Sequence, residues 1–400
     1  MKHLIKKLLL VSVGLVFAFL LLEAALRIVG YSFPAFVRMD QARGWSLWPN
    51  QQGWTRNEGG KIYLKISSDG LRDVEHPVEK PAPTLRVAIL GDSYSEAAQV
   101  QMDQSFWSVM GRQLDGCPVV NAKKVEVINF GVDGYGTDQE LLTLREQVWS
   151  YAPDIIVLVF TPSNDVTDNS RILSVEKDKP FFVYQEGKLV MDASFRASFQ
   201  YHARESWPMQ LYYRAVNSLR VLQLVRQTKN LWRQRKLGEM VQGTTDSGGV
   251  KFGLADLSYR QPADPAWKDA WQVTEALLQE LNNEVMARGS AFLVVTVTRA
   301  IQVNPDPELR RNYVKRLGVD NLFYPEQRIA ALGKTTGFPV LTLAQPFVEH
   351  AERDHKFLHF GGGHWNIEGN HLAGEMIAHK ICEIQGASDK AADASNRTRE

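Results

Sequence analysis

The sequence predicts an α/β protein with a five-stranded parallel sheet, helices on both faces and one N-terminal transmembrane helix before it. Three observations lead to this prediction. Five short, nearly continuous apolar runs are spread along the chain, helical patterns separate most of them, and a long uncharged segment lies near the N-terminus. Parallel strands are buried on both faces, because the connecting helices cover the sheet from both sides.

The five apolar runs are the expected strands. They occupy residues 85–90, 125–129, 154–160, 291–297 and 338–343. Apolar residues recur at helical spacing between and after them, in residues 105–114, 138–150, 265–288, 325–333 and 368–384. Runs of this length rich in Val and Ile favour strands, whereas the longer periodic segments favour helices.

The uncharged N-terminal segment runs from Leu8 to Leu22 and follows Lys2, Lys6 and Lys7. About 20 mostly apolar residues span a bilayer, and lysines before the span place the N-terminus in the cytoplasm. A cleaved signal peptide is the alternative, although Glu23 beside the run makes a poor cleavage context. Both interpretations export the remaining chain; we expect an uncleaved anchor in the inner membrane and a periplasmic domain.

The domain organisation follows from these elements. We expect an anchor over residues 1–31, a β-rich lead-in and linker over 32–83, and a main domain over 84–385. Residues 386–400 are polar and predict a disordered tail. In the lead-in, residues 61–67 alternate like a short strand.

The main domain carries an insertion at about residues 168–261. Its basic stretch, residues 209–236, predicts an amphipathic helix, and residues 242–249 predict a flexible loop. The helix would pack on the domain with a solvated face, or would form a surface for anionic lipid heads or an acidic polysaccharide.

Charge and cysteine content exclude some classes of function. The formal net charge is +1, so no global electrostatic argument favours nucleic acid. The two cysteines, Cys117 and Cys382, have neither zinc-ligand spacing nor a CxxC pattern. They would be able to pair in an oxidising compartment, but the simpler expectation is two unpaired thiols.

Polar residues follow the expected strands at the edge where open α/β sheets bind ligands. The first strand runs into Gly91-Asp92-Ser93, which places a serine hydroxyl at a strand-to-helix turn. Such a serine is a candidate nucleophile if a base lies beside it, and otherwise an ordinary helix N-cap. The second strand is followed by a glycine-rich loop containing Gly134, and the third by Asn164. Backbone and side-chain N–H groups there would stabilise an oxyanion.

A histidine stands in a glycine-rich loop before the last helix, in the stretch Gly361-Gly-Gly-His364. Core packing explains this position poorly. A base delivered in space to a serine explains it well.

Together these four segments, in this order, resemble the SGNH/GDSL hydrolase superfamily over most of residues 85–384. The resemblance implies a flavodoxin-like α/β fold and a serine esterase. It implies Ser93 as nucleophile and His364 as base. It further implies an oxyanion site made by the Ser93 and Gly134 amides and the Asn164 side chain, with no metal or cofactor.

One position departs from the family pattern. The family has an aspartate three residues before the histidine to orient the imidazole, and this chain has Gly361 there. The orienting role could pass to a backbone carbonyl, to a carboxylate elsewhere such as Asp354, or to nothing. A solvated loop acid between Arg353 and His355 is the simpler explanation of Asp354.

Three hypotheses for function remain open. The first is an esterase that removes acetyl or similar groups from an extracytoplasmic carbohydrate or lipid. The second is an O-acyltransferase on an exported polysaccharide that uses the same serine and histidine. The third is a non-catalytic binding protein on this scaffold, which the absent aspartate favours. The sequence does not give the oligomeric state.

Overall fold

Five parallel strands form the central sheet of the computed structural model, which describes residues 1–120, 124–242 and 253–397. They are β5 (Thr84–Gly91), β6 (Lys124–Asn129), β7 (Ile155–Phe160), β10 (Ala291–Thr296) and β11 (Val340–Thr342). Their order is β11-β10-β7-β5-β6, which is the flavodoxin-like order. The predicted fold class is therefore confirmed, including the number and the approximate bounds of the strands in this sheet.

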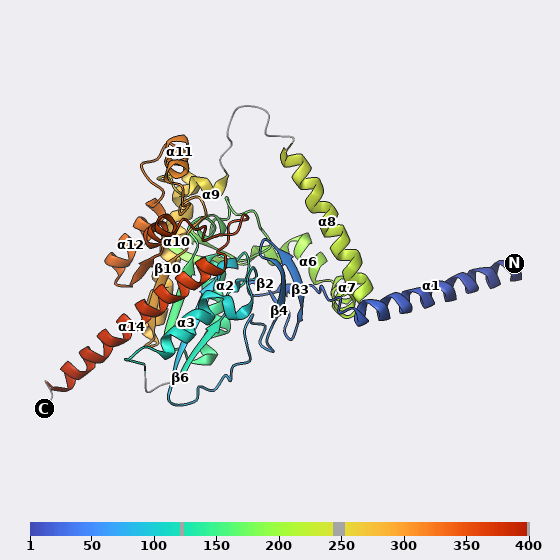
Figure 1. The fold of residues 1–400 in the computed structure, drawn as a ribbon, viewed down its shortest axis with the longest axis horizontal. Helices are drawn as coiled ribbons and strands as arrows, with labels where there is room; N and C mark the ends of the chain where they lie inside the picture. Colours follow the sequence, from blue (N-terminus) through green and yellow to red (C-terminus); the bar gives the residue numbers. More distant parts are fainter. Residues whose placement is uncertain (121–123, 243–252, 398–400) are drawn as a thin grey trace.

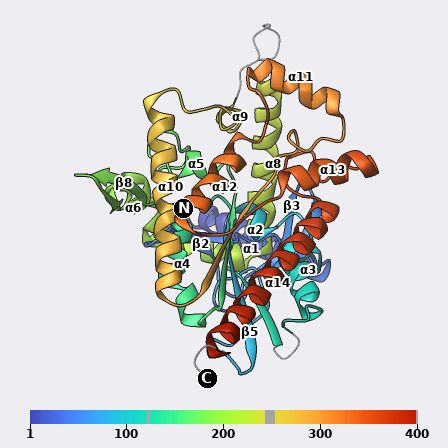
Figure 2. The ribbon, with the colours of Figure 1, turned by 90° about the vertical axis from the view of Figure 1, so that its left-hand side faces the viewer.

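Helices cover the sheet on both faces (Figure 2). One face carries α3 (Phe106–Asp115), α13 (Ala344–Asp354) and α14 (Ile367–Arg397). The other face carries α4 (Thr137–Glu146), α10 (Pro265–Ala287) and α12 (Tyr324–Thr336). Successive residues of β5 contribute to opposite cores, since Val87 packs on the first side and Ala88 on the second, both fully buried. This double burial is why the strands are apolar without alternation.

Some helices differ from the sequence prediction. The stretch predicted as one helix over residues 138–150 is α4 followed by the 3-10 helix η2 (Val148–Tyr151). Helix α13 and the peripheral α11 (Pro307–Leu317) were not predicted. Helix α14 continues to Arg397, through most of the region predicted as a disordered tail.

The lead-in segment, residues 32–83, forms two antiparallel hairpins. The first pairs β1 (Val37–Asp40) with β2 (Gly44–Leu47), and the second pairs β3 (Gln52–Asn57) with β4 (Gly60–Lys65). The sequence predicted the second strand of the second hairpin and missed the other three. Short strands that contain Trp, Gly and Arg have too little periodicity to be recognised.

The helical insertion lies between β7 and β10. It consists of α5 (Asp165–Asp168), β8 (Phe181–Gln185), β9 (Lys188–Asp192), the 3-10 helix η3 (Ser194–Ala197), α6 (Phe199–Glu205), α7 (Trp207–Ser218), α8 (Arg220–Gln242) and α9 (Leu254–Leu257). The predicted basic helix is thus two helices, α7 and α8. The predicted loop at 242–249 lies almost entirely outside the described residues.

The N-terminal helix α1 (Lys2–Ile28) extends away from the rest of the chain. Helix α8 begins near the C-terminal end of α1 and runs at a steep angle to it (Figure 1). At about 1.5 Å per residue its 27 residues reach about 40 Å, enough to cross a bilayer. Arg27 Nη2 donates to the carbonyl oxygen of Ser218 at 2.7 Å, and Glu23 accepts the Val221 amide at 3.0 Å. The end of α1 is therefore attached to the α7–α8 junction. The chain thus carries one hydrophobic N-terminal helix among its described residues, consistent with a signal sequence or an anchor.

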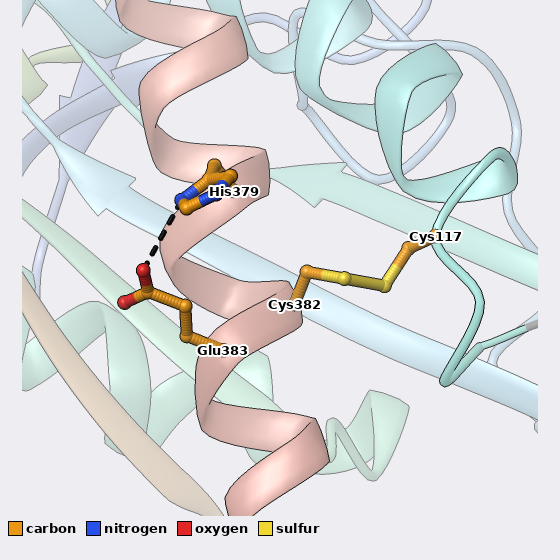
Figure 3. The surroundings of a disulfide bond; sticks show 4 residues. All are labelled: Cys117, His379, Cys382 and Glu383. Atoms are coloured by element: carbon orange, nitrogen blue, oxygen red, sulfur yellow. Dashed lines mark ion pairs between the residues drawn. A yellow bond between two sulfur atoms is a disulfide. The ribbon is translucent and has the colours of Figure 1, made fainter.

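Cys117 and Cys382 form a disulfide, which corrects the expectation of two unpaired thiols (Figure 3). The bond joins the loop after α3 to α14, and the two Cα atoms are 6.2 Å apart. The sequence could not reveal the pair, because 265 positions separate the two cysteines and only the packing of α3 against α14 brings them together.

We predict that Cys382→Ser lowers the free energy of unfolding by about 3 kcal/mol, the typical effect of losing a bond that restricts the unfolded chain. Urea unfolding of the detergent-solubilised full chain, wild type beside the variant, measures the change. Titration of the purified wild type with a thiol reagent under denaturing conditions is the control. Two free thiols per chain would contradict the disulfide.

Candidate active site

The candidate residues gather at the carboxyl edge of the sheet, where β5 and β7 lie side by side. Ser93 follows β5 and Asn164 follows β7. The chain continues from β5 to β6 on one side and from β7 to β10 on the other. The topology therefore reverses between β5 and β7, and open α/β sheets form their binding crevice at such a point.

Ser93 is the first residue of the short helix α2 (Ser93–Glu96) and is 6% exposed. Its neighbour Asp92 holds the turn, because one carboxylate oxygen accepts the Tyr94 amide at 2.9 Å. The other oxygen accepts Asn164 Nδ2 at 3.2 Å. Burial raises the pKa of Asp92 to about 6, against the effect of these hydrogen bonds. Asp92 thus braces two strand ends and does not point at the serine.

His364 reaches Ser93 from a tight loop just before α14. Its Nε2 lies 2.8 Å from Ser93 Oγ, a hydrogen-bond distance. The loop closes on itself through the Phe360 amide, which donates to the His364 carbonyl at 2.8 Å. The Tyr94 hydroxyl fixes the loop to α2 by a 2.7 Å contact with the Gly363 carbonyl. The two residues that the sequence paired are therefore in contact across 271 positions.

Glu58 occupies the position on the far side of the imidazole. One of its carboxylate oxygens, Oε1, is hydrogen-bonded to His364 Nδ1 and also accepts the His364 amide at 3.2 Å. A carboxylate on Nδ1 keeps the proton of the neutral ring there and leaves Nε2 as the acceptor for the Ser93 hydroxyl. Serine, histidine and glutamate thus form a continuous chain of hydrogen bonds, in the arrangement of a catalytic triad.

The tip of the β3–β4 hairpin brings Glu58 to this position. Asn57 Nδ2 donates to the Ala98 carbonyl at 2.6 Å, and a Cβ at Gly59 would collide with the carbonyl of Gln99. On the other side, a Cβ at Gly362 would collide with the Glu58 carboxylate. The glycine run at 361–363, which replaces the family's aspartate, therefore makes the space through which Glu58 enters.

Asp354 does not reach His364. It is the last residue of α13, where its carboxylate pairs with Arg353 at 2.8 Å and lies 3.4 Å from His350. The expectation of Asp354 as orienting residue is corrected accordingly, since Glu58 holds Nδ1. Sequence reasoning missed Glu58, because a single acid on a hairpin tip 306 positions away has no recognisable spacing. The glycines in place of the aspartate were the one available signal.

The loop containing Gly134 lies beside Ser93. The Val132 amide donates to the Gly91 carbonyl at 3.1 Å, which ties this loop to the turn before the serine. Gly134 has φ +78°, a left-handed conformation that favours glycine. Trp45 of the lead-in holds the loop from outside, since its Nε1 donates to the Asp133 carbonyl at 3.0 Å.

The expected oxyanion donors are thus held by rigid neighbours. Among the described residues, the amides of Ser93 and Gly134 donate to no protein acceptor. Asn164 uses one side-chain N–H on Asp92, and its amide group has a second. Trp365, which follows His364 directly, is 1% exposed and packs between Tyr94 and Phe106.

Glu96 at the end of α2 is a buried acid that holds the Gly134 loop. Its Oε2 accepts the Asp133 amide at 2.7 Å, and its side chain is almost fully buried. Burial, and after it the charge of Asp133, raise the pKa of Glu96 to about 7. The proton on Glu96 is therefore held much more tightly in the folded than in the unfolded chain.

No protein-family model and no curated protein matches the chain. Solved structures do. The acetyl xylan esterase AlAXEase is similar with a TM-score of 0.39 and 12% identity, over 74% of this chain and 100% of that one. Axe2, an acetylxylan esterase from Geobacillus stearothermophilus, has a TM-score of 0.35 and 12% identity, over 74% and 94%. LAE5, an alpha/beta hydrolase enzyme from the metagenome of Lake Arreo, has a TM-score of 0.35 and 12% identity, over 76% of this chain and 95% of that one. Similarities with TM-scores this low give no information about the activity or the substrate of this chain.

We predict that wild type loses stability relative to Glu96→Gln as the pH rises. The folded-state pKa of Glu96 is raised from 4.5 to about 7, so its contribution is complete below pH 4.5 and is lost as the pH passes 7. Urea unfolding between pH 5 and 8 measures the difference between the two proteins. The solvent-exposed Glu79→Gln is the matched control, and a pH-independent difference for Glu96→Gln would contradict the shift.

Proposed function

We propose that this protein is a serine esterase that acts outside the cytoplasm on acetyl or similar small acyl esters of a carbohydrate or lipid. The observation that carries the proposal is the hydrogen-bonded chain from Ser93 through His364 to Glu58 at the carboxyl edge of the sheet. A serine hydroxyl is a weak nucleophile unless a base removes its proton, and here the base and its orienting carboxylate are both in position.

The first half of the reaction is acylation. His364 Nε2 takes the Ser93 proton as Oγ bonds to the ester carbonyl carbon, and the carbonyl oxygen becomes an oxyanion. The amides of Ser93 and Gly134 and the Asn164 side chain would donate to that oxyanion, and such donors are worth about 3–4 kcal/mol each. His364 then gives its proton to the leaving alcohol as the ester C–O bond breaks.

The second half returns the enzyme to its starting state. Water gives a proton to His364 while its oxygen attacks the acyl-enzyme. Oγ leaves with the proton from His364, and the acid is released. Glu58 stabilises the imidazolium in both halves through Nδ1 and is not itself required to take a proton.

The location outside the cytoplasm rests on two features of the chain. Helix α1 is long and apolar enough to cross a membrane, and Lys2, Lys6 and Lys7 lie at its N-terminal end, before the apolar run. The Cys117–Cys382 disulfide is typical of an oxidising compartment. We propose that α1 stays attached as an anchor, because Glu23 and Arg27 connect it to the α7–α8 junction.

The alternative of a non-catalytic binding protein depended on the absent aspartate before His364. Glu58 fills the role of that aspartate, so the main support for this alternative is removed.

We predict that Ser93→Ala abolishes hydrolysis of p-nitrophenyl acetate by the purified full chain, because the nucleophile is lost. A fluorophosphonate probe should label wild type at Ser93 and leave the variant unlabelled. Wild type that neither hydrolyses the ester nor takes up the probe would overturn the proposed function.

We predict that Glu58→Gln lowers kcat for p-nitrophenyl acetate by about 10²–10⁴-fold and changes KM little, because Glu58 acts through His364 and not on substrate. Glu58→Asp should recover part of the loss. The matched control is Asp354→Asn, which removes a carboxylate that does not touch His364. Equal effects of Glu58→Gln and Asp354→Asn would show that Glu58 does not orient the base.

A further inference from the structure

A large cleft lies beside the loop containing Gly134, between the lead-in segment and helices α7 and α8. Its volume is about 1060 Å³, just above the range of about 300–1,000 Å³ that is typical of small-ligand pockets. Gly134 and Asp133 are among the residues that line it. A substrate whose ester lies over Gly134 would therefore extend along this cleft, and the volume suits a chain of several units better than a single small molecule.

The cleft is rich in arginine. Five arginines line it: Arg38, Arg56, Arg204, Arg214 and Arg226. Three of them have partners, because Arg38 Nε donates to Ser46 Oγ, Arg204 pairs with Asp178 and Arg226 donates to the Pro34 carbonyl, each at 3.1 Å.

The other two arginines are available to a ligand. Arg56 comes from β3 and Arg214 from α7, so they stand on opposite walls of the cleft. Both are solvent-exposed, and within the described ranges neither forms a hydrogen bond or ion pair through its guanidinium group. Guanidinium groups bind carboxylates through two parallel hydrogen bonds, so this pair fits anionic groups on both sides of a ligand.

Carboxylates also line the cleft, but the protein itself already uses or neutralises most of them. They are Glu96, Asp133, Asp168, Glu176 and Glu205. Glu176 accepts the Asp178 amide at 3.1 Å, and Glu205 accepts Gln41 Nε2 at 3.1 Å. Burial raises the pKa values of Glu96 and Asp168 to about 7, which reduces their negative charge at neutral pH. Glu176 and Glu205 keep their charge, so the cleft carries both signs, and among its lining arginines Arg56 and Arg214 are the ones whose guanidinium groups have no protein partner within the described ranges.

The lead-in wall of the cleft is aromatic. Its rings are Phe33, Phe36, Trp45, Trp48 and Trp54. Aromatic faces pack against flat, weakly polar surfaces such as the C–H faces of sugar rings. Arginines near such rings suit a ligand in which apolar faces alternate with anionic groups. A lipid tail has no such alternation.

From this lining we infer that the cleft binds an acidic polysaccharide, an extended sugar chain bearing carboxylates, and presents its O-acyl groups to Ser93. The inference rests on the proposed esterase function and names its substrate class. Arg56 and Arg214 are the specificity-determining residues, and neither belongs to the catalytic machinery.

The test compares acetylated oligogalacturonides with acetylated cello-oligosaccharides of equal length on the full chain in detergent. We expect a lower KM for the acidic substrate, and we expect that KM to rise with ionic strength because the attraction is screened. Arg56→Gln and Arg214→Gln should each raise KM for the acidic substrate about tenfold, the scale of one charged hydrogen-bonded contact. The kcat for that substrate, and turnover of p-nitrophenyl acetate, should stay unchanged. Arg311→Gln, an exposed arginine on α11 away from the cleft, is the matched control.

Two outcomes would overturn the inference while leaving the esterase intact. In the first, p-nitrophenyl acetate is hydrolysed but the acidic and neutral oligosaccharides have equal KM values. In the second, vesicles of anionic phospholipid, but not unacetylated oligogalacturonide, compete with the acetylated substrate, so that the arginines serve lipid headgroups. Absence of any Ser93-dependent hydrolysis would instead refute the proposed function, so the two failures are distinguishable.

Discussion

The hydrogen bond between Glu58 and His364 is the contact on which the arrangement of the site depends. It joins residues 306 positions apart, and it selects the imidazole tautomer that leaves Nε2 facing Ser93. The bond exists only because the β3–β4 hairpin docks on the backbone after α2 and because Gly362 has no side chain. The lead-in segment is therefore part of the candidate site, although the sequence placed it outside the main domain.

Buried acids hold the other loops of the site in a common way. Asp92 accepts the Tyr94 amide, Glu96 accepts the Asp133 amide and Asp165 accepts the Thr161 amide. Each carboxylate thus fixes the chain just beyond one strand of the sheet, and burial raises the pKa of all three. Burying these acids costs free energy, but the hydrogen bonds that they accept hold the loops in place. Donors for an oxyanion would then need no rearrangement when charge develops.

The sequence predicted what local pattern determines. Doubly buried strands such as β7 are continuous apolar runs, and Ser93 and His364 stand in glycine-flanked turns that packing does not explain. It could not predict what depends on distant contacts. Glu58 and the Cys117–Cys382 disulfide are brought to their partners by the fold alone, and their spacing in the chain has no regularity. Helix α13 was missed because it follows β11 almost directly, with only Leu343 between them.

Helix α1 is attached to a wall of the cleft but does not hold the triad. The hairpin that carries Glu58 is held by contacts with residues that follow α1, at Ala98 and Gly362, so the triad geometry does not require α1. The cleft does involve it, because its outer wall is α7 and α8, and Glu23 and Arg27 fasten their junction to the end of α1. Since the lead-in wall also begins where α1 ends, both walls share one attachment point. If the protein is the esterase that we propose, retaining α1 would matter more for binding a long substrate in the cleft than for the reaction at Ser93.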